Sequence, residues 1–155
     1  MLRRNLIKAV PLAIAFSPLL VRAQPRLGLR TFRDPGCECC LGWVRHIEQA
    51  GFDVSVEDRA RTDPGRGRSG APAALIGCHT ALHGRFGFEG HVPAAAVKRF
   101  LADPGPWVGL AVRGMPVGSP GMEVAGVAAE TYEIFRFDGS GWWEPYIQAR
   151  GSMIM

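Results

Sequence analysis

The first half of the chain shows strand and helix patterns in turn. Residues 27–33 alternate as a short strand does, and an Asp34-Pro35-Gly36 turn follows them. Residues 41–50 carry apolar side chains at helical spacing, and Gly51 is placed to end that helix. Residues 52–57 alternate again. The pattern therefore predicts a β-α-β unit with a tight turn before its helix.

A hairpin and a second helix are predicted next. Residues 79–83 and 86–89 flank a glycine turn as two short strands would. Pro93 opens a helix that is expected to run to about Ala102, since the missing N–H of proline costs nothing in the first turn.

The last third combines an irregular stretch with a second hairpin. Residues 107–129 are rich in Gly, Pro and Met and are predicted to be irregular. Residues 132–137 and 142–147 have the pattern of a terminal hairpin. The tail at 151–155 is expected to be frayed.

The order of these elements indicates an α/β fold. Strand, turn, helix, strand, hairpin and helix is the order of a thioredoxin-like domain, a mixed sheet with flanking helices. We expect one such domain over residues 24–105, with a C-terminal extension over residues 106–155 packed on it. About 130 residues can build one core without disulfides, which leaves the cysteines free for chemistry.

Residues 1–23 have the pattern of a secretory signal peptide. Basic residues precede an apolar run at residues 9–21, and Ala23 supplies a small residue before a cut. An uncleaved anchor is the alternative, but the run is shorter than the roughly 20 apolar residues that span a bilayer. The mature protein is expected to start near Gln24, to be exported and to have no membrane span.

Removing that segment changes the charge balance. The whole chain has 18 Lys and Arg against 14 Asp and Glu, and residues 1–23 hold four of the basic residues and none of the acidic ones. The mature protein is formally neutral. A nucleic-acid partner is not expected, because it would require a concentrated basic face.

Three of the four cysteines lie together in the sequence Cys37-Glu38-Cys39-Cys40. Soft sulfur donors select Cu(I), zinc or iron–sulfur clusters, and a helix N-terminus stabilises a thiolate. Cys78 lies just before the predicted hairpin, where a thioredoxin-like layout would face it toward the same helix end. Redox exchange and metal binding are the two functions that this motif supports.

Structural zinc and structural disulfides are weaker interpretations. Structural zinc sites normally keep two or more residues between ligands, whereas Cys-x-Cys-Cys favours thiolates that bridge several metal ions. Three cysteines within four residues leave one unpaired among themselves, although Cys78 could form a plain disulfide with Cys37 or Cys40.

Met115 and Met122 are further candidate ligands. Both lie in the irregular stretch, and thioether sulfur suits Cu(I). A role in pinning this stretch to the core is equally open for both.

The histidines are open in the same way. His79, His83 and His91 could each be a ligand or an ordinary structural residue. If His79 and Cys78 share a strand, their side chains should point to opposite faces. His46, inside the first helix, is expected to be solvated.

Four motifs follow one another along the chain: Cys-x-Cys-Cys, Gly77-Cys78-His79-Thr80, Glu89-Gly90-His91-Val92-Pro93-Ala94, and the run from Gly114 to Glu123. In this order they resemble the CopG-type periplasmic proteins found with bacterial copper-resistance systems, and the resemblance covers most of residues 27–125.

The resemblance implies a periplasmic, thioredoxin-like protein that binds copper. It implies copper held by the thiolates of Cys37, Cys39 and Cys40 and interconversion of Cu(I) and Cu(II). The crowding of the three sulfurs adds the expectation that several copper ions are bridged, and periplasmic copper efflux or carrier proteins are the expected partners. Cys78, Met115 and Met122 complete the candidate ligand set. Copper comes from the resemblance and not from the composition.

Three functions follow as hypotheses. The first is a copper-dependent oxidoreductase in copper resistance, with Cys37, Cys39 and Cys40 as its redox residues. The second is a thiol–disulfide oxidoreductase in which Cys37 attacks and Cys40 resolves, although the neighbouring Glu38 carboxylate would raise the pKa of these thiols. The third is a non-catalytic copper chaperone or buffer.

Export gives the first testable prediction. The order of basic, apolar and small residues places the mature N-terminus within a few residues of Gln24. N-terminal sequencing of protein taken from the periplasm should find that end, and an intact Met1 there would contradict it.

Overall fold

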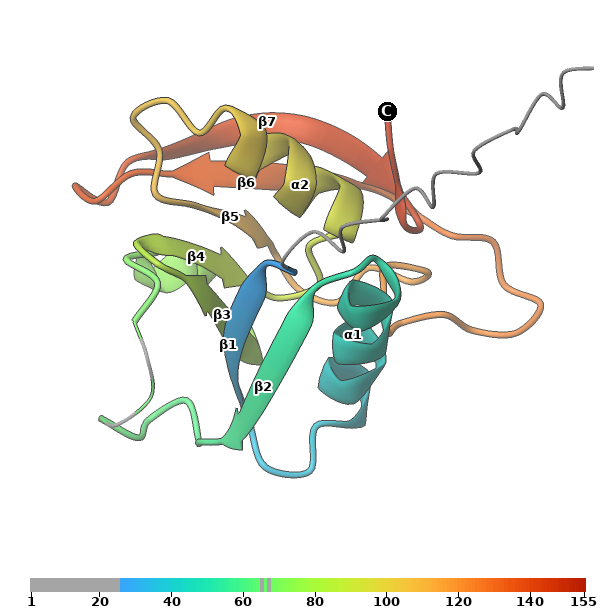
Figure 1. The fold of residues 1–155 in the computed structure, drawn as a ribbon. Coiled ribbons are helices and arrows are strands. Elements are labelled where there is room, and N and C mark those ends of the chain that lie inside the picture. The colour runs from blue at the N-terminus through green and yellow to red at the C-terminus, as the bar shows by residue number, and fades with distance from the viewer. Residues whose placement is uncertain (1–25, 65, 67) are drawn as a thin grey trace, which may run out of the picture.

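The computed structural model describes residues 26–64, 66 and 68–155. In this part of the chain an eight-stranded mixed sheet, in the order β2-β1-β3-β4-β5-β6-β7-β8, carries two α-helices (Figure 1). The expected α/β class is therefore confirmed. The proposed signal peptide at 1–23 lies outside the described residues. No helix among the described residues is long and apolar enough to cross a membrane.

The elements predicted for the first two thirds of the chain are confirmed with small shifts of their ends. The strands are β1 (Gly28–Arg33), β2 (Asp53–Asp58), β3 (His79–His83), β4 (Phe86–Glu89), β5 (Gly109–Val112), β6 (Thr131–Phe137), β7 (Trp143–Arg150) and β8 (Met153–Ile154). The helices are α1 (Glu38–Gln49) and α2 (Ala94–Ala102), with a 3-10 turn η1 (Ala73–Leu75).

Two predictions for the last third were wrong. Residues 107–129 contain β5, which pairs with β4 and β6 in the middle of the sheet. All four of its residues are buried, so no alternation marked it as a strand. The tail is not frayed, because β8 pairs with β7 and Ile154 packs against the main core.

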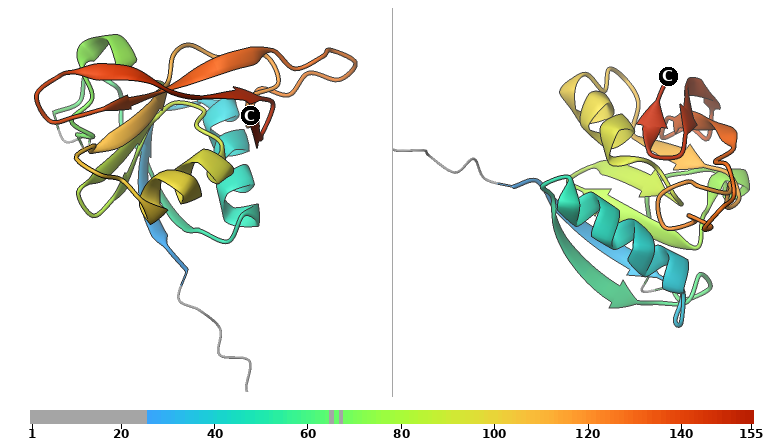
Figure 2. Two further views of the ribbon diagram at one scale, coloured as in Figure 1. Left: turned by 90° about the horizontal axis from the view of Figure 1, so that it is seen from above. Right: turned by 90° about the vertical axis from the view of Figure 1, so that its right-hand side faces the viewer.

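The two helices pack against one shared core. Trp43 and Ile47 of α1 join Val97 and Phe100 of α2 in the main apolar cluster. A smaller cluster around Leu75 and Phe137 lies on the opposite face of β5 and β6, as the alternation of their side chains requires. Figure 2 shows the twist between the β1–β4 half and the β5–β8 half of the sheet.

His46 connects the two helices and is not the solvated residue that we expected. It is half-buried, and its Nε2 accepts a hydrogen bond of 3.0 Å from the backbone N–H of Ala94 at the start of α2. This N–H is one of the donors that a helix start leaves without an intrahelical partner. Burial lowers the pKa of His46, which keeps the imidazole neutral and able to accept.

Replacing His46 should therefore destabilise the protein in a pH-dependent way. His46→Ala leaves the buried Ala94 N–H unpaired, at a cost of about 1–3 kcal/mol in the free energy of unfolding near pH 7.5. The folded pKa lies below the unfolded value of about 6.5, so the wild-type contribution is present above that pH and is lost as pH falls through the folded pKa.

Urea unfolding of the metal-free protein at several pH values between 7.5 and 5 would measure this. The difference between wild type and His46→Ala should shrink as pH falls, while the exposed neighbour Arg45→Ala should stay within about 0.5 kcal/mol of wild type. A difference that is constant with pH would contradict the assigned hydrogen bond.

Candidate metal centre

The pairing of β1 with β3 brings Cys78 beside the Cys-x-Cys-Cys turn. The two strands are antiparallel and place Arg33 opposite His79, so the residue after β1 meets the residue before β3. The backbone N–H of Asp34 donates to the carbonyl oxygen of Cys78 at 3.0 Å. The N–H of Cys37 then donates to the Asp34 carbonyl at 3.2 Å and closes the turn.

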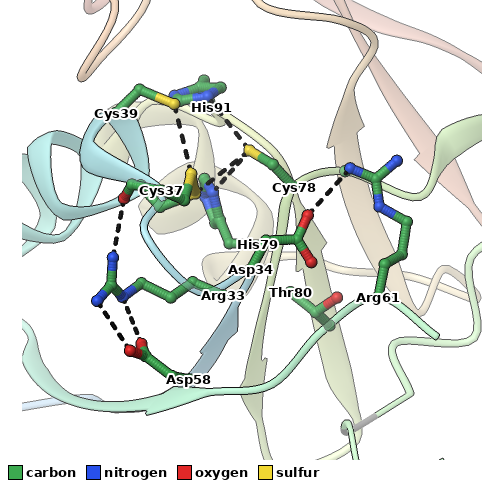
Figure 3. The surroundings of a disulfide bond; sticks show 12 residues. Arg33, Asp34, Cys37, Cys39, Asp58, Arg61, Cys78, His79, Thr80 and His91 are labelled. Atoms are coloured by element: carbon green, nitrogen blue, oxygen red, sulfur yellow. Dashed lines mark hydrogen bonds and ion pairs between the residues drawn. A yellow bond between two sulfur atoms is a disulfide. The ribbon is translucent and has the colours of Figure 1, made fainter. Parts of the chain in front are cut away.

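The four cysteine sulfur atoms converge at this point. Figure 3 shows Cys37, Cys39 and Cys78 facing one another. Cys37 and Cys40 form a disulfide, and Cys39 and Cys78 are free thiols. Cys39 Sγ lies 3.5 Å from Cys37 Sγ, and Cys78 Sγ lies 3.4 Å from Cys40 Sγ. All four sulfurs lie within 4.8 Å of one another. The disulfide that Cys78 could have formed with Cys37 or Cys40 is absent from this arrangement.

Two histidines extend the sulfur group. Cys78 Sγ lies 3.5 Å from His79 Nδ1 and 3.6 Å from His91 Nε2, and these three ligand atoms also lie within 4.8 Å of one another. The expectation that His79 points away from Cys78 was wrong. Strand alternation does not apply between them, because β3 begins at His79 and Cys78 belongs to the preceding loop.

His91 is fixed in the tautomer that leaves a nitrogen lone pair for the site. Its Nδ1–H donates to the Pro120 carbonyl oxygen at 2.8 Å, so Nε2 facing Cys78 carries no proton when the ring is neutral. Burial lowers the pKa of His91, which favours this neutral form. A hydrogen bond on the far ring nitrogen is the usual way in which a protein orients a metal-binding histidine.

The Pro120 carbonyl reaches His91 because the following loop lies directly on α1. Gly121 has a φ of +87°, and a Cβ atom there would come within 2.3 Å of the Cys39 carbonyl oxygen. A Cβ on Gly42 would meet the Gly121 Cα at 2.7 Å. A glycine at both positions is therefore required for this close approach. The approach brings the C-terminal extension into contact with the turn that carries the cysteines.

His79 is one of three candidate ligands that are fully buried, together with Cys40 and His91. Its ring centroid lies 4.4 Å from that of Trp43 and 5.2 Å from that of His91. Burial lowers its pKa well below the usual range, with the neighbouring His91 and Arg66 acting in the same direction. Its Nε2 has no hydrogen-bond partner among the described residues. The ring is thus held neutral beside the free thiol of Cys78.

The environment of Cys78 favours the protonated thiol in the absence of a cation. Burial, followed by the charge of the Cys39 thiolate, raises the pKa of Cys78 to about 11. A bound cation would reverse this preference, because its charge stabilises a coordinating thiolate. The site is therefore poorly suited to a free thiolate at Cys78 and well suited to a metal-bound one.

Buried polar side chains hold the segment that carries Cys78. The carboxylate of Glu89, fully buried, accepts hydrogen bonds from the Gly77 N–H at 3.0 Å and from the Thr80 hydroxyl at 3.0 Å. Burial raises the pKa of Glu89, opposed by these hydrogen bonds. Arg66 bonds Asp34 at 2.8 Å and so ties this network to the turn. Glu89 and Arg66 were not among the site residues predicted from the sequence, although Glu89 opens one of the four motifs.

The cysteine turn is also held by Arg33, which contacts both the turn and β2. Arg33 donates to the carbonyl oxygen of Cys37 at 3.0 Å and forms an ion pair of 2.7 Å with Asp58 at the end of β2 (Figure 3). The backbone at Cys37 is therefore fixed by groups other than its sulfur.

His83, another candidate ligand, is not part of this group. His83 lies at the far end of β3, where its Nδ1 is bonded to the Gly28 carbonyl at 2.8 Å. Met115 is 57 % exposed, and Met122 is half-buried in the loop next to Gly121. His46 is occupied at the start of α2.

The comparisons with known proteins agree with the motifs. The family model described as "Protein of unknown function, DUF411" matches residues 75–122, the stretch from before Cys78 to just past Pro120. No curated protein matches the chain.

Two solved structures are similar to almost the whole described chain. "Copper resistance protein copG- Form 1" is 35% identical, with a TM-score of 0.73, and the match covers 82% of this chain and 100% of that one. "Copper resistance protein copG- Form 2" is also 35% identical, with a TM-score of 0.72 and coverage of 81% and 99%. With this identity over this length, the chain belongs to the CopG family of copper resistance proteins.

Proposed function

We propose that this protein is an exported copper-resistance protein that binds copper at the Cys37, Cys39, Cys40 and Cys78 sulfurs and interconverts Cu(I) and Cu(II). The observation that carries the proposal is the convergence of these sulfurs within 4.8 Å, with His79 and His91 nitrogens beside Cys78. The copper ions are the substrate of this site. The presence of copper-resistance proteins among the similar structures supports this choice of metal.

The mixed donor set supports a redox role better than a storage role alone. Thiolate sulfur favours Cu(I), whereas imidazole nitrogen also suits Cu(II). Cys78 belongs to both the all-sulfur group and the sulfur–imidazole group, so an ion can exchange one set of ligands for the other at a shared atom. Sulfurs this close can also bridge several copper ions, as a cluster requires.

We further infer that β1 to α2 is a thioredoxin-like domain. The order β2-β1-β3-β4, with only β3 antiparallel to the other three, supports this inference. A boundary near residue 105 would make β5–β8 the extension, and that extension supplies the Pro120 carbonyl to His91. Periplasmic copper efflux or carrier proteins are the proposed partners, since an exported copper site must pass its ions on.

The methionines have a supporting part in this proposal. Met122 follows the glycine that touches α1, so it is the better candidate for a thioether ligand. Met115 is well exposed and is proposed as an outer contact for incoming or leaving copper.

Thiol–disulfide exchange is the second candidate, because Cys37 and Cys40 are joined in a disulfide at the start of α1. A Cys-x-x-Cys pair at this position is the usual arrangement for such exchange. A third and a fourth thiol in contact with the pair would divert the exchange, which is why we place this function second. A non-catalytic copper buffer would use the same ligands without turnover.

The ligands can be tested by substitution. Replacing any one of Cys37, Cys39, Cys40 or Cys78 by Ser should lose more than one copper equivalent, because bridging sulfurs each serve several ions. His91→Ala should weaken copper binding about tenfold or more, since His91 faces the shared sulfur. Metal analysis after anaerobic loading with Cu(I), with competition against a chromophoric chelator, would measure both effects.

His83→Ala is the matched control, because His83 is on the same sheet but bonded to Gly28 at the far end of β3. It should keep the full copper content. Equal losses of one equivalent for each cysteine would indicate independent sites and would contradict the bridged arrangement.

The two redox functions make opposite predictions about metal. If copper is the redox centre, the visible absorption of the protein should change on oxidation and reduction, and chelation of copper should abolish the activity while the thiols remain. If thiol exchange is the function, metal-free protein should reduce an insulin disulfide, with Cys37→Ser inactive and Cys39→Ser nearly normal. Stopped-flow spectra and an insulin turbidity assay would decide, and robust metal-free turnover would overturn our choice.

A further inference from the structure

The Cys37–Cys40 pair has no assigned part in copper binding while it is oxidised, since a disulfide sulfur is a poor ligand compared with a thiolate. We propose that this pair is the electron donor for copper reduction at the site, an inference that rests on the proposed function. Two Cu(II) ions accept one electron each and become Cu(I). The Cys37 and Cys40 thiols form one S–S bond and release two protons.

The backbone around the pair is fixed by contacts that do not involve its sulfurs. The two Cα atoms are 5.3 Å apart, a separation that admits a disulfide without movement of the chain. The Cys37 carbonyl accepts from Arg33 at 3.0 Å, and the Cys37 N–H donates to Asp34. The pair can therefore open and close by rotation of its side chains, while the other ligands stay in place.

Each sulfur of the pair touches one free thiol. Cys37 Sγ is 3.5 Å from Cys39 Sγ, and Cys40 Sγ is 3.4 Å from Cys78 Sγ. A copper ion held by Cys39 or Cys78 can therefore also contact a donor sulfur, which gives each of two ions a direct route for one electron.

The free thiols then hold the product. Cys39 and Cys78 remain unoxidised, with their sulfurs within 4.8 Å, and the imidazole nitrogens of His79 and His91 lie beside Cys78. This set of two sulfurs and two nitrogens suits Cu(I).

The choice of pair matters for this outcome. A Cys40–Cys78 disulfide would consume the one sulfur that the two ligand groups share, and it would leave the imidazoles without a thiolate partner. With the Cys37–Cys40 bond, by contrast, the disulfide lies within the turn, and both Cys78 and the neighbouring Cys39 remain free thiols. Reduction and retention of copper can therefore occur in the same site. A further round requires an external thiol to reduce the disulfide.

The experiment uses metal-free protein with all four cysteines reduced, mixed without oxygen with two equivalents of Cu(II). We expect the Cu(II) electron paramagnetic resonance signal to disappear, two Cu(I) ions to be captured by bicinchoninate after denaturation, and the thiol count to fall from four to two. Trypsin cuts after Arg33, Arg45, Arg68 and Arg85, so Cys37, Cys39 and Cys40 share one peptide while Cys78 is in another. Fragmentation of the first peptide should place the disulfide between Cys37 and Cys40.

Variants separate the donor pair from the retaining thiols. Cys37→Ser and Cys40→Ser should reduce Cu(II) at least about tenfold more slowly than wild type. Cys39→Ser should still lose two thiols but release its Cu(I) to the chelator faster. His83→Ala should behave as wild type in every measurement.

The outcomes distinguish this inference from the proposed function. Copper that binds and becomes Cu(I) without loss of thiols, or with a disulfide that includes Cys78, would overturn the electron-donor role and leave copper binding intact. Equal reduction rates in Cys37→Ser, Cys40→Ser and wild type would overturn it as well. Protein that binds no copper in either oxidation state would instead reject the proposed function.

Discussion

The antiparallel pairing of β1 with β3 is the constraint on which the rest of the site depends. It places Arg33 opposite His79, and the hydrogen bond from the Asp34 N–H to the Cys78 carbonyl fixes the two loops at their exit from the sheet. A shift of one residue in this register would separate the Asp34 N–H from the Cys78 carbonyl and so move Cys78 relative to the cysteine turn. The buried network of Glu89, Arg66 and Thr80 supports the same register from behind. The same contacts therefore stabilise the sheet and set the geometry of the site.

Burial prepares the site for a metal ion rather than for a free charge. His79 and His91 are buried in neutral form, and the pKa of Cys78 is raised to about 11. Each shift works against a charged group in the absence of a partner. Under the proposed function, a copper ion would provide that partner for the thiolate and would accept the lone pairs of the neutral imidazoles. The apolar surroundings, including Trp43 against His79, therefore favour metal coordination over acid–base chemistry.

The sequence was sufficient to predict the elements with a clear hydrophobic period and the candidate ligands that lie in a motif. The β-α-β unit, the hairpin at 79–89 and α2 were predicted, as was the approach of Cys78 to the turn. Strand β5 was not predicted because all its residues are buried and show no alternation. Strand β8 was not predicted because two residues are too few to show a period. His79 was misjudged because strand alternation was applied to Cys78, which lies before the predicted strand at 79–83 and belongs to the preceding loop. His46 looked solvated because its partner, the Ala94 N–H, is 48 residues away in the chain and has no signature in the sequence.

The last third of the chain completes the site that the first two thirds begin, and its contribution was the least predictable from the sequence. The Pro120 carbonyl selects the tautomer of His91, and it can do so only because Gly121 and Gly42 let the loop lie against α1. Neither contact involves a residue type that signals metal binding. A domain without this loop would keep its four sulfurs but would lose the group that orients the imidazole. Sulfur alone holds Cu(I) well, whereas a site that also accepts Cu(II) benefits from an oriented nitrogen. Under the proposed function, the loop would therefore account for the difference between a copper store and a site that receives both oxidation states.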